Sequence, residues 1–597
     1  MNRTAPRRPR RSVLLGLFSV LALAPVRTAA AAAPYTPSWA SLDTHNAAPE
    51  WFQDAKFGIY FHYGAFGTPA YGNEWYPRRM YSTTDACYAH HIATYGDPFS
   101  SWPYNNFIDG ANDKTGKLVQ FAPKLVSAGG ALDPDAFAQL FVAAGARFAG
   151  PVMEHHDGFS MWDSKVNEWN SVNKGPKLNL AKLWTDAFRS RGLKIVAAMH
   201  HAYHFTGYYQ FAPTPADPSL QKLFGKLSPA AENQLWYDKL KEVIDEFQPD
   251  ILWQDFNVRA VDTTQVLNFL AYYYNQAQAW KKEVVATYKD GMDNKGEVYD
   301  YERGGPADIT VPYWLTDDAI SSSSWAYSTG IAYYSNVSIL HGFIDRVSKG
   351  GNLLLNISPM PDGSLPQAQK DILLSMGDWL GKFGEAIYAT RPYAVYGEGP
   401  TKMGAPPGSP FTAPKAGTPQ DVRYTKSKDG DALYAIFLGW PGNGLRVTMA
   451  SVDSARFNLG PTAKVYLFGA TPGMATSLAF SQSPAGLQVT WPSAAPYQAL
   501  AYAIKITKSG TQPGAPPGLA DGGAPSPPAD SGVTAPVDGS GVSGDSSDSS
   551  TASSSGAGSG LVADEAGSDA AGDMWQPPSP PLDSGSSGST RAGSGSE

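Results

Sequence analysis

Strand-like and helix-like patterns alternate along residues 50–390, and this alternation restricts the fold more than any other feature of the chain. Short apolar runs, which predict buried strands, occur at 57–61, 146–153, 193–199, 251–252, 284–288 and 352–357. Amphipathic runs, which predict helices, occur at 134–144, 180–191, 232–247, 263–279, 337–347 and 367–383. Such alternation predicts a parallel α/β fold. Because no glycine-rich phosphate loop is present, a distorted (β/α)8-like TIM barrel with about seven recognisable strands is favoured over a dinucleotide-binding sheet.

The sequence pattern changes after the alternating strands and helices of the predicted barrel. We assign residues 34–395 to a catalytic barrel and 396–509 to a β-sandwich, because the latter range holds short apolar runs separated by turns and no helical periodicity. Residues 510–597 are rich in Gly, Ser, Ala, Pro and Asp. Such a segment cannot bury enough apolar area to offset the entropy of ordering, so we predict a disordered low-complexity tail.

The N-terminus has the layout of an export signal. A basic stretch, Arg7-Arg8-Pro9-Arg10-Arg11, is followed by an apolar run over 13–26 and a small-residue zone over 29–33. This layout predicts a signal peptide over 1–33, and its paired arginines resemble a twin-arginine signal. We therefore expect a protein that is secreted or periplasmic. Cys87 is the only cysteine, which excludes an intramolecular disulfide.

Charge and aromatic content narrow the classes of partner. The formal net charge is −8 and no basic patch is evident, so nucleic acid is not an expected partner. The chain holds 16 Trp, 31 Tyr and 26 Phe with only 17% charged residues, a composition that suits a carbohydrate-facing surface but is also common in secreted enzymes. We expect no cofactor and no metal, and the sequence does not predict an oligomeric state.

The run Pro249-Asp250-Ile251-Leu252-Trp253-Gln254-Asp255 is the strongest local indication of a site. Trp253 and Asp255 lie two positions apart and therefore share one face of the strand. A carboxylate at the C-terminal end of a barrel strand is typical of catalytic chemistry, although an aspartate that only caps the following loop has the same local sequence. The side chains that gather at predicted strand ends are His62, Glu74, Trp75, His155, His156, Tyr203, Trp253 and Asp255.

Together these residues and their surroundings resemble the α-L-fucosidases of glycoside hydrolase family 29. The resemblance is carried, in order along the chain, by Phe57-Gly58-Ile59-Tyr60-Phe61-His62, Glu74-Trp75-Tyr76, His155-His156-Asp157-Gly158-Phe159, Trp169-Asn170-Ser171, Gly175-Pro176-Lys177, Leu252-Trp253-Gln254-Asp255 and Asn352-Leu353-Leu354-Leu355-Asn356-Ile357. It implies a distorted barrel followed by a β-sandwich. It also implies a retaining exo-glycosidase that removes terminal α-L-fucosyl groups from glycans through a covalent intermediate.

The resemblance implies a role for each residue. Asp255 is the expected nucleophile and Glu302, in Asp300-Tyr301-Glu302-Arg303-Gly304, is the expected general acid/base. Because this part of the family varies, Glu297, Asp300 and Asp318 stay open as alternatives. The expected fucose-binding residues are His62, Glu74, Trp75, His155, His156, Tyr203, Trp253 and Trp325. The linkage preference does not follow from the sequence; we expect the insertion over 81–127 to influence it.

Two other functions remain open at this point. Six histidines near strand ends are compatible with a metal-dependent barrel hydrolase, although the first strand lacks a His-x-His pair and the adjacent His155 and His156 should point apart on a strand. The chain is also compatible with a non-catalytic glycan-binding protein in which the β-sandwich is the working part. Retention of both Asp255 and Glu302 favours the hydrolase.

Overall fold

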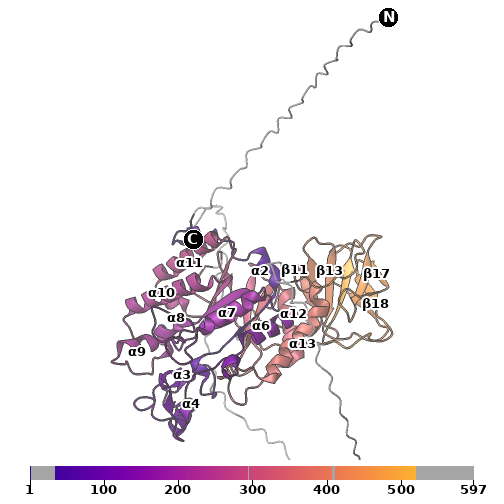
Figure 1. The fold of residues 1–597 in the computed structure, drawn as a ribbon. Helices are drawn as coiled ribbons and strands as arrows, with labels where there is room; N and C mark the ends of the chain where they lie inside the picture. Colours follow the sequence, from indigo (N-terminus) through magenta and orange to yellow (C-terminus); the bar gives the residue numbers. More distant parts are fainter. Residues whose placement is uncertain (2–33, 294, 407–410, 519–597) are drawn as a thin grey trace, which may run out of the picture. The chain divides into compact units, whose positions relative to one another are not determined.

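The computed structural model describes Met1 and residues 34–293, 295–406 and 411–518 (Figure 1). Residues 2–33 of the predicted signal peptide and residues 519–597 of the predicted tail lie outside the described residues. Residues 510–518, which we assigned to the tail, are described and contact the barrel. The Gly514 amide donates to Glu385 (2.6 Å), and Arg147 donates to the Pro517 carbonyl oxygen (2.6 Å).

Eight parallel strands form the catalytic barrel. They are β1 (Phe57–Phe61), β4 (Phe148–Glu154), β5 (Lys194–Met199), β6 (Ile251–Gln254), β7 (Val285–Tyr288), β8 (Val298–Tyr299), β9 (Trp314–Ala319) and β10 (Gly351–Ile357). Their order is β8-β7-β6-β5-β4-β1-β10-β9. A bridge between Asp300 and Leu315 brings β8 next to β9, so the barrel is nearly closed.

Two of these strands, β8 and β9, were not predicted individually. β8 has only two residues, and β9 contains Asp317 and Asp318, so neither forms a recognisable apolar run. Our count of about seven strands is therefore corrected to eight. The other six lie within a few residues of the predicted ranges.

The strands are apolar throughout because both of their faces are buried. In β1, Tyr60 packs in the cluster inside the barrel, while Ile59 and Phe61 pack in the larger cluster beneath the helices. In β6, Trp253 faces inward and Leu252 faces outward in the same way. This alternation decides which polar residues at the strand ends point into the barrel.

The α-helices in the described part of the chain are α1 (Trp39–Leu42), α2 (Glu50–Ala55), α3 (Tyr76–Arg79), α4 (Ala86–Thr94), α5 (Asn106–Asp109), α6 (Pro134–Ala143), α7 (Leu180–Ser190), α8 (His201–Tyr203), α9 (Pro218–Leu223), α10 (Pro229–Phe247), α11 (Thr263–Trp280), α12 (Asn336–Ser348) and α13 (Gln367–Phe383). All six predicted helices are present, as α6, α7, α10, α11, α12 and α13. Five of these begin at a side chain that accepts a hydrogen bond from the first turn: Asp133, Asn179, Ser228, Asp262 and Ser335. No helix among the described residues is both long and apolar enough to cross a membrane.

The C-terminal part of the described chain is a β-sandwich (orange in Figure 1). One sheet contains β11 (Thr390–Glu398), β12 (Val422–Ser427), β13 (Ala432–Phe437), β19 (Tyr502–Thr507), β15 (Lys464–Phe468) and β16 (Ala475–Ser477). The other contains β14 (Arg446–Met449), β18 (Gly486–Thr490) and β17 (Phe480–Ser483). Arg423 of β12 donates to buried Asp345 of α12 (2.6 Å), which attaches the sandwich to the barrel's outer helices.

Candidate active site

One set of polar side chains lies on the inward face of the barrel, at the C-terminal ends of the strands. Counting in steps of two from the inward core residues of β1, β5, β6, β7, β8, β9 and β10 reaches His62, His200, Asp255, Lys289, Asp300, Glu302, Asp317 and Asn356. This end of a barrel is where enzymes of the fold carry their chemistry.

Asp255 directly follows β6 and is only 6% exposed. Its Oδ1 lies 3.0 Å from Nζ of Lys289, and its Oδ2 lies 3.1 Å from Nε2 of His156 and 4.0 Å from Nε2 of His200. Burial by itself would raise the pKa of Asp255, but the lysine charge and the two imidazoles outweigh burial and hold the pKa well below its usual range. Asp255 is therefore ionised, as a nucleophile must be.

Lys289 joins the two predicted catalytic carboxylates. Its Nζ lies 3.0 Å from Oδ1 of Asp255 and 2.8 Å from Oε2 of Glu302, so these two oxygens are at most about 5.8 Å apart, the sum of the two distances. That limit fits the separation of about 5–5.5 Å in retaining glycosidases and lies below the 6.5–9.5 Å of inverting ones. Burial would lower the pKa of Lys289, but the surrounding carboxylates raise it well above its usual value, so the lysine is charged.

A tight turn holds Glu302 beside Lys289. The amide of Arg303 donates to the Asp317 carbonyl oxygen (2.9 Å), and Arg303, Gly304 and Gly305 all have positive φ. A Cβ at Gly304 would lie 1.8 Å from Oγ1 of Thr412, so a larger residue there would displace the turn. The Glu302 side chain keeps 15% of its surface exposed, which leaves it reachable by a substrate.

Two of the alternative acid/base candidates lie away from the inward face. Glu297 precedes β8, at the opposite end of the strand, and accepts a hydrogen bond from Tyr274 of α11 (2.8 Å). Burial raises the pKa of Glu297 to about 8. Asp318 points outward from β9 and pairs with Arg346 of α12. Neither carboxylate contacts Asp255 or Lys289.

The third alternative, Asp300, lies inside the barrel but deeper than Glu302. Its Oδ2 accepts a hydrogen bond from Nε1 of Trp253 (2.8 Å), and its neighbour Asp317 accepts one from the Tyr60 hydroxyl (2.9 Å). Both carboxylates are 1% exposed. Burial raises the pKa of Asp300 to about 6 and that of Asp317 well above its usual value. Glu302 is thus the better-placed proton donor for a leaving group.

His62 is fixed in one tautomer by its neighbour. Oδ1 of Asn356 lies 2.7 Å from Nδ1 of His62 and also accepts the His62 amide (3.0 Å). Because this oxygen can only accept, Nδ1 carries the proton and Nε2 has a lone pair. Burial lowers the pKa of His62 to about 3, so the imidazole is neutral. His62 can therefore accept a hydrogen bond from a hydroxyl.

Glu74 and Trp325 are brought together from distant parts of the chain. Oε2 of Glu74 accepts hydrogen bonds from the amide of Trp325 (2.9 Å) and from Oγ of Ser324 (3.0 Å). The Trp325 ring lies 5.5 Å from the His62 ring, measured between centroids. These contacts place a carboxylate, an imidazole and an indole on one side of the site.

A second aromatic wall contains Trp75 and Tyr203. The Trp75 ring lies 5.4 Å from His156 and 5.8 Å from Tyr203, and Tyr203 lies 5.0 Å from Phe256, the residue after Asp255. The sequence position of Tyr203 suggested the end of a strand, but Tyr203 does not lie there. It belongs to the short helix α8, and the residue directly after β5 is His200.

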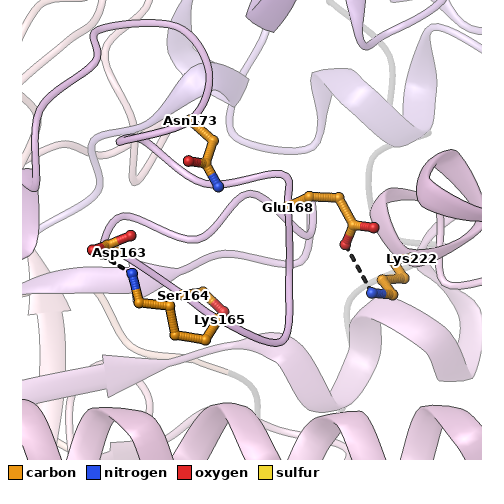
Figure 2. Close-up of a pocket in the computed structure, with 6 residues that line it drawn as sticks. All are labelled: Asp163, Ser164, Lys165, Glu168, Asn173 and Lys222. Atoms are coloured by element: carbon orange, nitrogen blue, oxygen red, sulfur yellow. Dashed lines mark hydrogen bonds and ion pairs between the residues drawn. The ribbon is translucent and has the colours of Figure 1, made fainter.

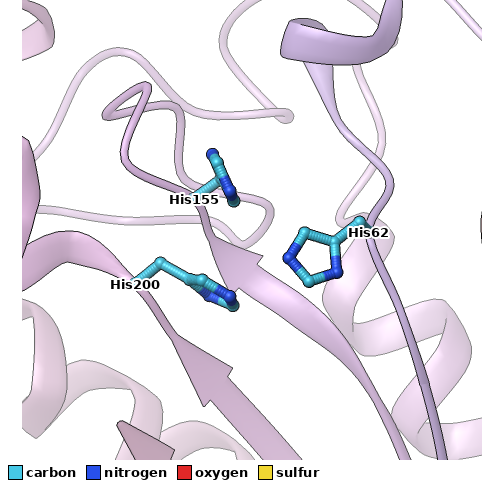
Figure 3. A group of neighbouring side chains, drawn as sticks. All are labelled: His62, His155 and His200. Atoms are coloured by element: carbon cyan, nitrogen blue, oxygen red, sulfur yellow. The ribbon is translucent and has the colours of Figure 1, made fainter. Parts of the chain in front are cut away.

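Three histidines from neighbouring strands meet at the centre of the site. His62, His155 and His200 follow β1, β4 and β5, and Figure 3 shows their rings converging on one space. The buried Nδ1 atoms of His155 and His200 have no hydrogen-bond partner within the described structure. His156 instead directs Nδ1 to the His200 carbonyl oxygen (2.5 Å) and Nε2 to Asp255.

The structure adds residues that the sequence analysis did not select: Lys289, His200, Asn356 and Asp317. Continuing the inward alternation past Val285 in β7 would have reached Lys289. The same alternation in β5 would have preferred His200 to Tyr203. The alternation of inward residues therefore indicated both positions, but it could be followed only with the exact strand boundaries.

A polar hollow lies elsewhere, beside the loop that follows β4. It measures about 340 Å³ and is lined by Asp163, Ser164, Lys165, Glu168, Asn173 and Lys222 (Figure 2). Its charges are paired with one another, Lys165 with Asp163 (2.6 Å) and Lys222 with Glu168 (2.8 Å). None of the predicted site residues lines it.

Comparisons with known proteins identify the family of the chain. The family model for α-L-fucosidase matches residues 22–385, and the model for the α-L-fucosidase C-terminal domain matches 416–507. Tissue α-L-fucosidase of Homo sapiens is 30% identical over 513 residues, covering 83% of this chain and 97% of the relative. The crystal structure of Thermotoga maritima α-fucosidase matches with a TM-score of 0.61 and 26% identity, over 79% of this chain and 100% of that one. A further structure of that enzyme, in complex with fucose, matches with a TM-score of 0.60 and 25% identity, over 79% of this chain and 100% of that one. This chain therefore belongs to the α-L-fucosidases of glycoside hydrolase family 29.

Proposed function

We propose that this chain is an exported exo-glycosidase that hydrolyses terminal α-L-fucosyl linkages of glycans with retention of configuration. The observation that carries the proposal is the Lys289 ammonium between Asp255 and Glu302. One oxygen of each carboxylate lies within 3.0 Å of Nζ, which is compatible with the short separation that a double displacement needs. Export is supported by the paired arginines and the apolar run of the N-terminus.

The first step of the proposed reaction forms a covalent intermediate. The Asp255 carboxylate attacks the anomeric carbon from the β face, and the bond to the aglycone oxygen breaks as Glu302 transfers a proton to that oxygen. In the second step Glu302 takes a proton from water, whose oxygen attacks the anomeric carbon and releases the Asp255 carboxylate. Two inversions give net retention.

Lys289 connects the two steps electrostatically. While Asp255 is ionised, the lysine charge is shared between Asp255 and Glu302. Once Asp255 is esterified it loses its charge, and Glu302, 2.8 Å from Nζ of Lys289, becomes the nearest carboxyl partner of the lysine in the second step.

The sugar pocket uses polar groups on one side and rings on the other. We propose that Nε2 of His62, the free oxygen of Glu74 and the imidazole of His155 bind fucose hydroxyl groups. His156 was also expected to bind a hydroxyl, but its two ring nitrogens contact the His200 carbonyl oxygen and Asp255, so it positions the nucleophile instead. Trp75, Tyr203 and Trp325 would supply the apolar surfaces against the ring and its methyl group. Trp253, also expected to bind the sugar, is fully buried and packs against Lys289 instead. The fucose complex of the T. maritima enzyme supports a site of this kind.

The stereochemical outcome tests the proposal. Proton NMR during hydrolysis of an aryl α-L-fucoside should show α-L-fucose as the first sugar formed, before mutarotation. Formation of β-L-fucose first would exclude the double displacement. Absence of turnover on any α-L-fucoside would favour a glycan-binding protein instead.

Replacing Lys289 by methionine should lower kcat about 100-fold, because both carboxylates lose their shared counter-charge in a buried site. Lys289→Arg should recover part of the loss, since it restores the charge with different geometry. The pH profile of kcat should shift in Lys289→Met, because Asp255 then titrates closer to its usual range. If kcat falls with an unchanged pH profile, Lys289 has only a packing role.

A further inference from the structure

The cluster formed by His62, His155 and His200 has the composition of a transition-metal site. One ring nitrogen from each residue lies within 4.8 Å of the other two, and all three residues are buried (Figure 3). They come from three strands that are neighbours in the sheet, in the order β5-β4-β1, so their backbones are held rigidly. Imidazole is a preferred ligand of Zn²⁺, Cu²⁺ and Ni²⁺.

The spacing of the three rings fits one ion. Their centroids are 5.4 Å apart for His62 and His155, 4.9 Å for His62 and His200, and 5.0 Å for His155 and His200. Three imidazoles bound tetrahedrally at about 2.1 Å would have ring centres about 5 Å apart.

A further observation points to a ligand at this place. The Nδ1 atoms of His155 and His200 are buried without a hydrogen-bond partner among the described residues, which is costly unless something binds there. Asp255 lies on the other side of the His200 ring, 4.0 Å from its Nε2, so the nucleophile is next to the cluster. The expectation that adjacent His155 and His156 exclude a metal site does not apply, because only His155 belongs to the cluster.

We propose that this cluster binds a divalent transition-metal ion, with Zn²⁺ as the reference case, and that the ion excludes fucose from the pocket. The metal is an inhibitor and not a cofactor, because it occupies His62 and His155, which the sugar needs, and lies against the nucleophile. The exclusion of sugar rests on the function proposed above; the binding of the ion does not.

Metal binding can be measured without any catalytic assay. Full-length protein, first freed of metal by a chelator, is titrated with Co²⁺ while the visible absorption of a low-symmetry nitrogen-ligated cobalt site is recorded. One Co²⁺ per chain should bind, and Zn²⁺ should displace it. His200→Gln and His155→Gln should each weaken binding at least about 100-fold. The matched control is His90→Gln, a histidine outside the cluster that stacks on Tyr71, and it should bind as the wild type does.

Competition with sugar then tests the second part. Saturating L-fucose should weaken the apparent affinity for Zn²⁺, and Zn²⁺ should inhibit hydrolysis competitively, with full recovery after chelation. Mg²⁺, which prefers oxygen ligands, should have no effect. A colourless Co²⁺ titration, or equal binding by the wild type and both cluster variants, would overturn the proposal. Tight Co²⁺ binding without fucosidase activity would keep the metal site and reject the proposed function.

Discussion

Replacing Asp255 by glycine should lower kcat on an aryl α-L-fucoside by about 10⁴-fold or more, since the double displacement cannot proceed without its nucleophile. The small side chain also opens space on the β face of the sugar. Added azide should enter that space and restore turnover, giving β-L-fucosyl azide as the product. A β-linked product means that azide displaced the aglycone with a single inversion. Azide would then have replaced the Asp255 carboxylate, which identifies Asp255 as the nucleophile.

A surface aspartate serves as the control for this variant. Asp163 pairs with Lys165 at the polar hollow of Figure 2, and its replacement by asparagine should leave kcat and KM unchanged. Because Asp255 is buried beside Lys289, Asp255→Gly must also be shown to be folded, by circular dichroism and thermal unfolding. If folded Asp255→Gly hydrolyses the substrate at the wild-type rate, the nucleophile has been assigned wrongly.

Replacing Glu302 by alanine should reduce kcat/KM about 10²–10⁴-fold for a fucosyl disaccharide, whose sugar leaving group needs a proton. The loss should be much smaller for a 2,4-dinitrophenyl fucoside, whose leaving group departs without help. Azide should accelerate the dinitrophenyl reaction and yield α-L-fucosyl azide, because it attacks the covalent intermediate on Asp255. Asp255→Gly should thus give the β-linked azide and Glu302→Ala the α-linked azide. This difference distinguishes the nucleophile from the acid/base.

Glu297 provides a matched control for Glu302. It is a glutamate near β8 like Glu302, but it is buried and bonds to Tyr274 at the other end of the strand. Glu297→Gln should therefore retain the activity of the wild type on both substrates. If instead Glu297→Gln shows the dependence on leaving group and Glu302→Ala does not, the acid/base role belongs to Glu297.

The barrel could be predicted because its strands are apolar on both faces and its helices are amphipathic. The strands β8 and β9 could not, because one is too short and the other has polar residues facing both the interior and α12. The same two strands explain why part of the site could not be predicted. Without β8 and β9, the inward alternation could not be followed to Asp317.

The site residues divide in a similar way. Asp255 and His62 follow short but fully buried strands with recognisable apolar residues, so their position could be predicted from local sequence. The alternation in β7 reaches Lys289, but its role could not be recognised from sequence. A lysine after a strand is usually solvated, and only its place beside Asp255 and Glu302 gives it a function. The contact of Glu74 with Trp325 joins residues 250 or more positions apart, which the family resemblance implied only as shared membership of one site.

The most direct test of the account is to trap the covalent intermediate. The enzyme is incubated with 2-deoxy-2-fluoro-L-fucosyl fluoride, which forms the intermediate but slows its hydrolysis, and is then digested and analysed by mass spectrometry. The account predicts one fluorofucosyl group per chain, attached to Asp255, and no label in Asp255→Gly. Attachment to Glu302 or another carboxylate, or inactivation without a covalent label, would contradict it.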